Sequence, residues 1–271
     1  MLPTMKIGDL EVTRLIVGSN PFTGKSHLDK ATDDDMKSYF SDEQAFKMLD
    51  RCCEAGINAV QSRGSMPIMG LVGRYRQAGG KLLWLAQSGK NLETFDEELD
   101  EMMKYDPAAV CIHGELADDL YMSGKLNELE GLLNKIRRKK LPCGICAHFP
   151  EVLAYAEEKG LKPDYYMASL YNLSQTDRSH DVNPTGERFE ESDIPKMYEV
   201  IRKLSAPTFA LKILGAGRRC ETQEQVKSAF NEAFSSMKKG DGVLVGMFDK
   251  YIDQPFLNAQ YTKEAIELSE K

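Results

Sequence analysis

Short apolar runs alternate with stretches of helical spacing along the whole chain of 271 residues. Continuous apolar runs are typical of parallel strands that are covered on both faces. The predicted strands cover residues 13–19, 57–62, 81–87, 108–113, 141–148, 164–171, 206–213 and 242–247. The predicted helices cover residues 41–55, 68–77, 92–104, 116–139, 150–159, 193–204, 221–238 and 258–269.

Eight such units of about 34 residues each predict parallel strands joined by right-handed helical crossovers. The expected fold is therefore of the α/β class, a closed (β/α)8 TIM barrel. A doubly wound open sheet is the alternative arrangement of the same elements. No linker rich in Pro, Gly or Ser divides the chain, so we expect one domain over residues 1–271.

The charge balance restricts the class of partner. Lys and Arg number 35 and Asp and Glu number 42, which gives a net charge of −7 and a pI near 5.3. This acidic balance argues against nucleic acid as the binding partner, because binding to phosphates needs a basic protein face. No apolar run reaches the roughly 18 residues of a membrane span. The first residues lack the plan of a secretory signal, so we expect a soluble cytoplasmic protein with six reduced cysteines.

Two connections are longer than a barrel needs. They cover residues 20–40, after the first predicted strand, and 172–192, after the sixth. Both leave the carboxyl ends of strands, where barrel enzymes build their sites. They are expected either to form flaps over a pocket or to be passive surface connections.

Polar side chains stand at the ends of most predicted strands. They are Asn20, Gln61 with Ser62 and Arg63, Gln87 with Ser88, His113, His148, Asn172 and Lys212, and Gly246 with Met247 closes the series. In a barrel these ends converge on one mouth, which predicts a pocket for a small-molecule substrate. The candidate catalytic residues are His113, Lys212, His148, Gln61 and Gln87, and Asn20 and Arg63 are candidate substrate-binding residues.

Lys212 lies inside an apolar run, where its amine is costly to bury unless it reaches the mouth or a partner. It could form a Schiff base, act as an acid or base, or pair with a ligand anion. A structural ion pair is the alternative. The Gly215-Ala216-Gly217-Arg218-Arg219 segment that follows could offer N–H groups and cations to an anion, or be a tight turn.

The cysteines and histidines are candidate metal ligands. Cys143 and Cys146 have CxxC spacing, but on a strand they point to opposite faces. Cys111 with His113, and Cys146 with His148, each share a face, and together they form a set that zinc favours. Buried Cys and His on strands are more often packing residues, so no metal is the primary expectation.

The strand sequences together resemble the aldo-keto reductase superfamily over nearly the whole chain. The similar segments are TRLIVGSN at 13–20, AGINAVQ at 55–61, DPAAVCIH at 106–113, LKILGAG at 211–217 and GVLVGM at 242–247. The resemblance implies a barrel that reduces carbonyl groups with NADPH, using an Asp, a Tyr, a Lys and a His. Gln61, Met66 and Gln87 occupy the Asp, Tyr and Lys positions, and only His113 matches.

The resemblance also implies an NADP site along the carboxyl ends of the later strands. Gln254 and Asn258 match residues that bind the adenine end of the nucleotide, and Arg218 and Lys250 could supply positive charge. The implied cofactor-binding residues are Asn172, Gly215, Gly217, Arg218, Gly246, Met247, Lys250, Gln254 and Asn258.

Three functions remain open on the sequence. The first is a divergent oxidoreductase that uses NAD(P)H on a small carbonyl or sugar-like substrate. The second is a non-redox barrel enzyme, such as a lyase, epimerase or hydrolase, which would use Lys212 and the histidines for acid–base work. The third is an inactive barrel that binds a ligand.

Overall fold

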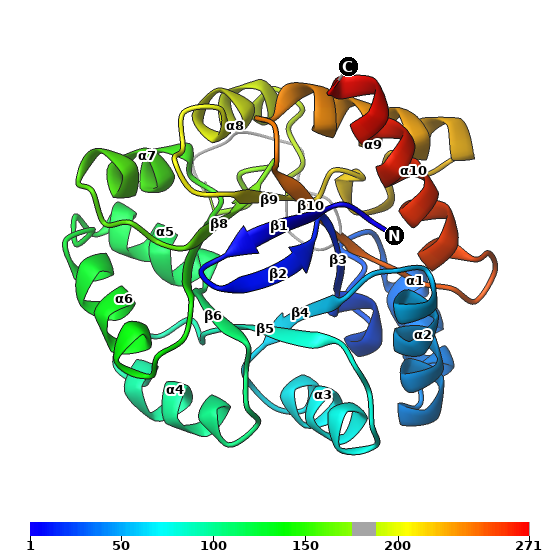
Figure 1. The fold of residues 1–271 in the computed structure, drawn as a ribbon, viewed down its shortest axis with the longest axis horizontal. Helices are drawn as coiled ribbons and strands as arrows, with labels where there is room; N and C mark the ends of the chain where they lie inside the picture. The colour runs from blue at the N-terminus through cyan, green and yellow to red at the C-terminus, as the bar shows by residue number, and fades with distance from the viewer. Residues whose placement is uncertain (175–187, 271) are drawn as a thin grey trace.

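A computed structural model describes residues 1–174 and 188–270. Eight parallel strands close into a barrel in the order β10-β3-β4-β5-β6-β7-β8-β9, as predicted (Figure 1). The strands are β3 (Leu15–Gly18), β4 (Ala59–Arg63), β5 (Leu83–Gln87), β6 (Ala109–Ile112), β7 (Cys143–Ala147), β8 (Tyr165–Ser169), β9 (Thr208–Leu211) and β10 (Gly242–Gly246). The chain is an α/β (β/α)8 TIM barrel, and the open sheet is excluded.

Helices surround the barrel on its outer face (Figure 1). They are α1 (Lys30–Tyr39), α2 (Asp42–Glu54), α3 (Ile68–Gln77), α4 (Phe95–Met103), α5 (Gly114–Met122), α6 (Glu128–Arg138), α7 (Pro150–Glu158), α8 (Asp193–Ile201), α9 (Gln223–Ser236) and α10 (Gln254–Ser269). None of the helices within the described residues is long and apolar enough to cross a membrane.

Two adjacent helices replace the single helix predicted over residues 116–139. The first, α5, ends at Met122, and Gly124 then takes a positive φ of 71°. A positive φ favours glycine and ends a helix, so the chain turns before α6 begins at Glu128.

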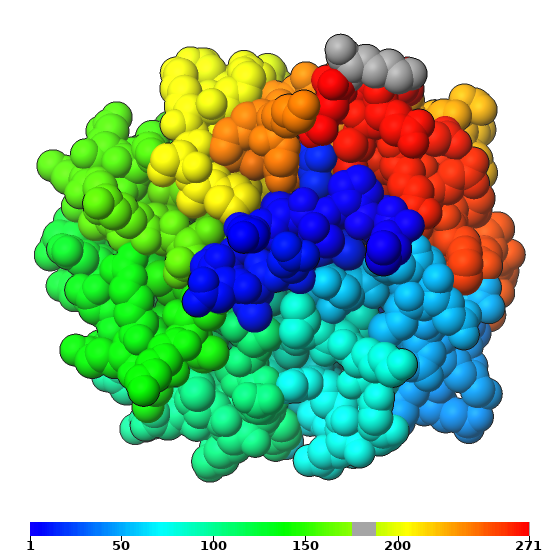
Figure 2. Space-filling model, viewed as in Figure 1, coloured from blue at the N-terminus to red at the C-terminus, as the bar shows by residue number. Residues whose placement is uncertain are grey.

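An antiparallel hairpin that the sequence patterns did not predict covers the amino end of the barrel. It consists of β1 (Thr4–Ile7) and β2 (Leu10–Thr13), and the N-terminal segment crosses this end of the molecule in Figures 1 and 2. Asn58, just before β4, fastens it: its Oδ1 accepts from the N–H of Thr13 at 2.8 Å, and its Nδ2 donates to Glu11 O at 2.9 Å. The predicted first strand, 13–19, therefore joins the end of β2 to all of β3.

The connection over residues 20–40 is more ordered than the expected flap. It contains a short 3-10 helix, η1 (Asn20–Thr23), and then α1, whose N-cap Asp29 accepts a hydrogen bond from Thr32 N at 2.7 Å. The Lys250 ammonium of the β10–α10 connection pairs with Asp35 of α1 at 2.5 Å. This connection is thus tied to the barrel. Most of the second long connection, 172–192, lies outside the described residues.

The apolar core has two layers, which follow from side chains alternating along each strand. The first layer lies between strands and helices and includes Trp84, Val110 and Cys143. The second fills the barrel interior and includes Ile16, Leu85, Cys111, Cys146 and Phe209, with Ile7 and Val12 of the hairpin. Because Gln61, Arg63, Gln87, His113 and His148 share the inward parity, the next layer toward the carboxyl ends is polar.

Candidate active site

A cavity of about 670 Å³ opens at the carboxyl ends of the barrel strands. It brings together most of the residues proposed from sequence: Asn20, Gln61, Arg63, Gln87, His113, Cys146, His148, Lys212, Gly217, Gly246, Gln254 and Asn258 line it. Cys111, Asn172, Gly215, Arg218, Met247 and Lys250 are not among the lining residues. The predicted mouth exists, whereas the role of each residue in it stays a prediction.

His148 is held by a buried carboxylate. Asp118 of α5 has no solvent exposure, and its Oδ2 lies 2.7 Å from His148 Nδ1 and 2.7 Å from the hydroxyl of Ser174. Its Oδ1 accepts from the backbone N–H groups of His148 at 3.1 Å and Phe149 at 3.2 Å. Since the carboxylate acts only as an acceptor here, His148 Nδ1 carries the proton.

In the neutral imidazole, this tautomer leaves Nε2 of His148 without a proton. The side chain is 11% exposed and lines the cavity, and no described residue hydrogen-bonds its Nε2. An imidazole that a buried carboxylate orients through Nδ1 is a general base at Nε2. Ser174 lies on the Nδ1 side of the ring, at 3.3 Å, so the three residues do not form a nucleophilic serine triad.

His113 has the opposite tautomer. It caps the start of α5, where its Nδ1 accepts from the backbone N–H of Glu115 at 3.1 Å. Burial, together with the positive charges of Arg63 and Lys90, lowers the pKa of His113 from 6.5 to about 2. The ring is therefore neutral at physiological pH and keeps its proton on Nε2. Such an imidazole donates a hydrogen bond to a substrate oxygen but does not exchange protons.

The low pKa of His113 makes stability depend on pH. Between pH 6.5 and 2 the unfolded chain binds a proton at His113 that the folded chain does not, so stability falls as the pH falls. We expect His113 to lower the unfolding free energy by about 2–3 kcal/mol between pH 7 and pH 4.5. In the variant His113→Asn, whose amide still caps the helix, urea unfolding at these two pH values should show a decrease that is smaller by this amount. An identical loss in both proteins would contradict the assignment.

Gly114 leaves room for the His148 ring and the Cys146 thiol at the cavity wall. A Cβ at this position would lie 3.1 Å from His148 Cε1 and 3.2 Å from Cys146 Sγ. We expect Gly114→Ala to displace the His148 ring and to destabilise the fold by about 1–3 kcal/mol. Gly131 of α6 is the matched control, because nothing lies within 4 Å of its Cβ position. Chemical denaturation of both variants checks this, and equal stabilities would contradict it.

Gln61 and Gln87 lie side by side on neighbouring strands. Gln61 Nε2 donates to Gln87 Oε1 at 3.3 Å, and both side chains are buried. Burial raises the pKa of the adjacent Cys146 thiol to about 12. The two amides can orient a substrate, and Cys146 is a neutral thiol rather than a nucleophile.

Lys212 follows β9 directly and lines the cavity. Its φ is +62°, a left-handed conformation that non-glycine residues rarely adopt and that is concentrated at functional sites. Gly215 N donates to Lys212 O at 2.8 Å and stabilises this bend. The structure thus places Lys212 at the mouth, as expected from its position at a strand end.

The Gly215–Gly217 segment, η2, does not form the anion cradle considered from sequence. The N–H groups of Gly217 and Arg219 donate to Leu214 O at 3.1 and 3.2 Å, and that of Arg218 donates to Gly215 O at 3.3 Å. Because these backbone N–H groups already have acceptors, the segment is a tight turn, which was the alternative considered from sequence.

The considered metal set does not assemble. Cys146 and His148 reach the cavity, whereas Cys111 is buried in the barrel interior, with its thiol 3.5 Å from Ile112 O. His148 Nδ1 is bound to Asp118. Within residues 1–174 and 188–270, no group of three His, Cys, Asp or Glu side chains is placed to hold a metal ion.

The residues implied for NADP fit that cofactor poorly. Lys250 pairs with Asp35, and Gln254 Oε1 accepts from Phe248 N at 2.7 Å. Arg218 donates to His27 O at 3.0 Å and stacks over the ring of Phe189 at 3.8 Å. These contacts occupy groups expected to bind the nucleotide. Met247 lies in the apolar core, and the N–H of Asn172 donates to Asp193.

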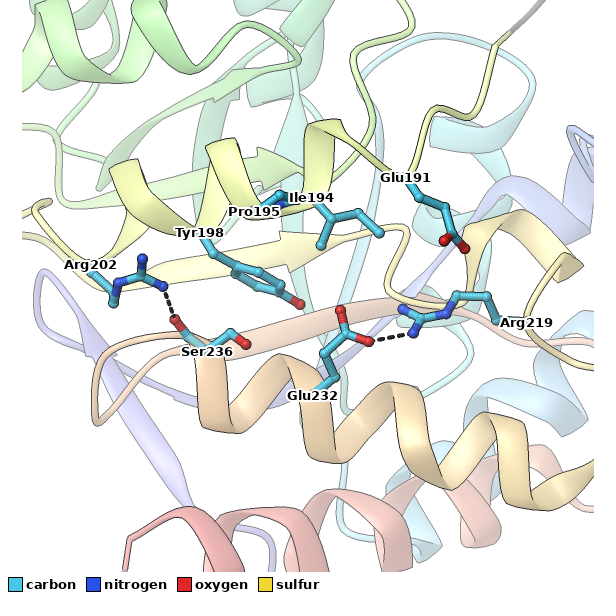
Figure 3. A pocket seen from close by; sticks show the side chains of 8 residues that line it. All are labelled: Glu191, Ile194, Pro195, Tyr198, Arg202, Arg219, Glu232 and Ser236. Atoms are coloured by element: carbon cyan, nitrogen blue, oxygen red, sulfur yellow. Dashed lines mark hydrogen bonds and ion pairs between the residues drawn. The ribbon is translucent and has the colours of Figure 1, made fainter.

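A second cavity, of about 340 Å³, lies between α8 and α9, away from the barrel mouth. Figure 3 shows Arg219 and Glu232 paired across it, with the Tyr198 side chain between the two helices. Arg202 donates to Ser236 O at 3.0 Å. Since both arginines have protein acceptors, this cavity shows no unsatisfied cation for a ligand.

Two groups of this site were missed from sequence. Asp118 stands beside Asp119 in α5, and the sequence holds no signal of which one is buried. Lys90 lines the cavity and pairs with Glu115. The helix break at Gly124 was a readable signal that α5 is a short helix beginning at the strand end.

The chain was compared with family models, with curated proteins and with solved structures. No family model matches, and no curated protein matches. An aldo-keto reductase from Bacillus halodurans in its holo form has a TM-score of 0.62 at 12% identity, over 99% of this chain and 96% of that one.

Two synthases have comparable scores. A truncated 3-deoxy-D-arabino-heptulosonate 7-phosphate synthase from Thermotoga maritima has a TM-score of 0.58 at 12% identity, over 99% of this chain and 92% of that one. The 3-hexulose-6-phosphate synthase from Salmonella typhimurium has a TM-score of 0.56 at 11% identity, over 94% and 99%. Reductase and synthases are similar to this chain at the level of the (β/α)8 TIM-barrel fold, and no family assignment follows.

Proposed function

We propose that this chain is an enzyme that moves a proton at a carbon next to a carbonyl group, on a small carbonyl or sugar-like substrate. The observation that carries the proposal is the Asp118–His148 pair: Asp118 binds Nδ1 of His148, and His148 lines the cavity. It narrows the non-redox alternative considered from sequence, a lyase, epimerase or hydrolase, to the epimerase and lyase classes.

The reaction divides between the two histidines. His148 Nε2 removes the proton from carbon, and the electron pair of that bond moves to the carbonyl oxygen. The Nε2–H of His113 donates to this oxygen as negative charge develops there, and because the donor is fixed in place it needs no reorganisation. Return of a proton from His148 to the same carbon re-forms the carbonyl group, and return after the enolate has turned its other face toward Nε2 gives the epimer.

Solvent exchange tests the proposal whatever the final product is. The protein is incubated in D2O with a panel of small ketones, aldoses and keto acids, and loss of the proton next to the carbonyl is followed by NMR. We expect exchange on at least one compound, reduced roughly 10²–10⁴-fold in His148→Gln. The exposed Glu151→Gln, three residues further along the chain, is the control. Exchange that persists in His148→Gln, or none on any compound, would contradict the proposal.

An NAD(P)H-dependent oxidoreductase is the second candidate. It is supported by the extent of the cavity, which reaches Gly246, Gln254 and Asn258, and by the resemblance of the strand segments to aldo-keto reductases. The unmatched Tyr, Lys and Asp positions weigh against it. Titration with NADPH, followed by nicotinamide fluorescence, separates the two: saturable micromolar binding supports a reductase, and no binding at millimolar nucleotide removes it.

A further inference from the structure

We propose that the mouth of the barrel binds its substrate by an oxyanion group, a phosphate or a carboxylate, and that Arg63 is the residue that receives this group. The inference rests on the proposed function for its premise that this cavity holds the substrate. It adds the chemical class of that substrate, an anionic carbonyl or sugar-like compound.

Arg63 is placed at the cavity by its strand. It is the last residue of β4, stands in register with Gln87 of β5, and has the inward parity of Gln61. Its side chain lines the cavity. An arginine at the end of a barrel strand therefore presents its guanidinium to the site rather than to solvent outside the barrel.

The guanidinium of Arg63 lacks an acceptor among the residues described. Its Nε is buried and has no hydrogen-bond partner there, and no described carboxylate forms an ion pair with the side chain. A buried donor without a partner destabilises the fold, so such a group in a native cavity points to a ligand that completes it. The guanidinium presents donors in a fork that matches phosphate and carboxylate oxygens.

The described part of the cavity wall carries further cations. The chain as a whole has a net charge of −7, but Lys25 and Lys90 line this part of the wall together with Arg63, beside the carboxylates of Glu115 and Asp119. Lys90 and Glu115 neutralise each other, and the nearby Asp118 is committed to His148. Burial, followed by the positive charges of Arg63 and Lys90, lowers the pKa of His113, which shows that the field of these cations reaches the cavity.

Anion binding to the intact protein tests this inference. Inorganic phosphate and malonate are titrated by isothermal calorimetry at constant ionic strength, which separates a phosphate site from a carboxylate site. We expect saturable binding of at least one, weakened roughly 10- to 100-fold in Arg63→Gln and less in Arg63→Lys, which keeps the charge but loses the fork. The control is Arg74→Gln, whose exposed side chain pairs with Asp42 on the outer surface. Equal affinity in Arg63→Gln, or no binding of either anion, would overturn the inference.

The variant His148→Gln separates this inference from the proposed function. It should bind the anion as the wild type does while losing solvent exchange. Arg63-dependent binding without exchange in the wild type would leave the anion site standing and remove the proton-transfer function. Exchange that is insensitive to Arg63→Gln, with unchanged anion affinity, would leave the function standing and remove the anion site.

Discussion

Replacing Asp118 by asparagine is expected to lower the exchange rate roughly 10²–10⁴-fold while the fold stays intact. The two backbone N–H groups at Oδ1 need an acceptor, so the amide oxygen of the variant takes that position. The NH₂ group then faces His148 Nδ1, where Oδ2 stands now. Nδ1 must accept, the ring proton moves to Nε2, and His148 can no longer remove a proton from substrate.

Asp100→Asn in α4 is the matched control for this change. It makes the same chemical substitution on an exposed side chain that pairs with Lys139 on the outer surface. Both variants should be compared by solvent exchange and by circular dichroism. A folded Asp118→Asn protein with the exchange rate of the wild type would show that His148 does not act through this carboxylate.

Truncation of Ile7 is expected to cost about 2–5 kcal/mol of unfolding free energy. Ile7 is the last residue of β1, is fully buried, and packs in the barrel interior with Val12 and Phe209. Ile7→Ala would remove contacts that close the amino end of the barrel and leave a cavity there. Urea unfolding measures the loss.

Lys6 supplies the comparison for Ile7. It precedes Ile7 in the same strand and points to solvent, as the alternating burial of β1 shows. Lys6→Ala should change the unfolding free energy by less than about 0.5 kcal/mol. A similar small effect of Ile7→Ala would mean that the hairpin rests on the barrel without stabilising it.

The barrel and its mouth could be predicted because their signals are local and repeated. Each barrel strand is a nearly continuous apolar run, and each polar strand end is visible directly after its run. Parity alone also placed Cys143 and Cys146 on opposite faces of β7, as found in the two core layers. All of these features follow from the order of residues within single segments.

The remainder of the structure depends on contacts between distant segments. The strands of the hairpin have only four residues each, and the partners of Ile7 come from strands spread over the whole barrel. Asp118 and Asp119 are the same residue type in the same helix, and only the packing of α5 against His148 makes Asp118 the buried one. Likewise, the sequence around Lys250 cannot show that Asp35, 215 residues away, takes the cation expected to bind a cofactor.

Long-range ¹H–¹⁵N NMR of the histidine side chains reads the tautomers of His113 and His148. The chain has four histidines, and the His113→Asn and His148→Gln variants assign two of them. We expect opposite tautomers at neutral pH: His148 protonated at Nδ1, and His113 protonated at Nε2 and not titrating down to pH 4. A His148 ring protonated at Nε2, or a His113 that titrates near pH 6.5, would contradict the division between base and hydrogen-bond donor.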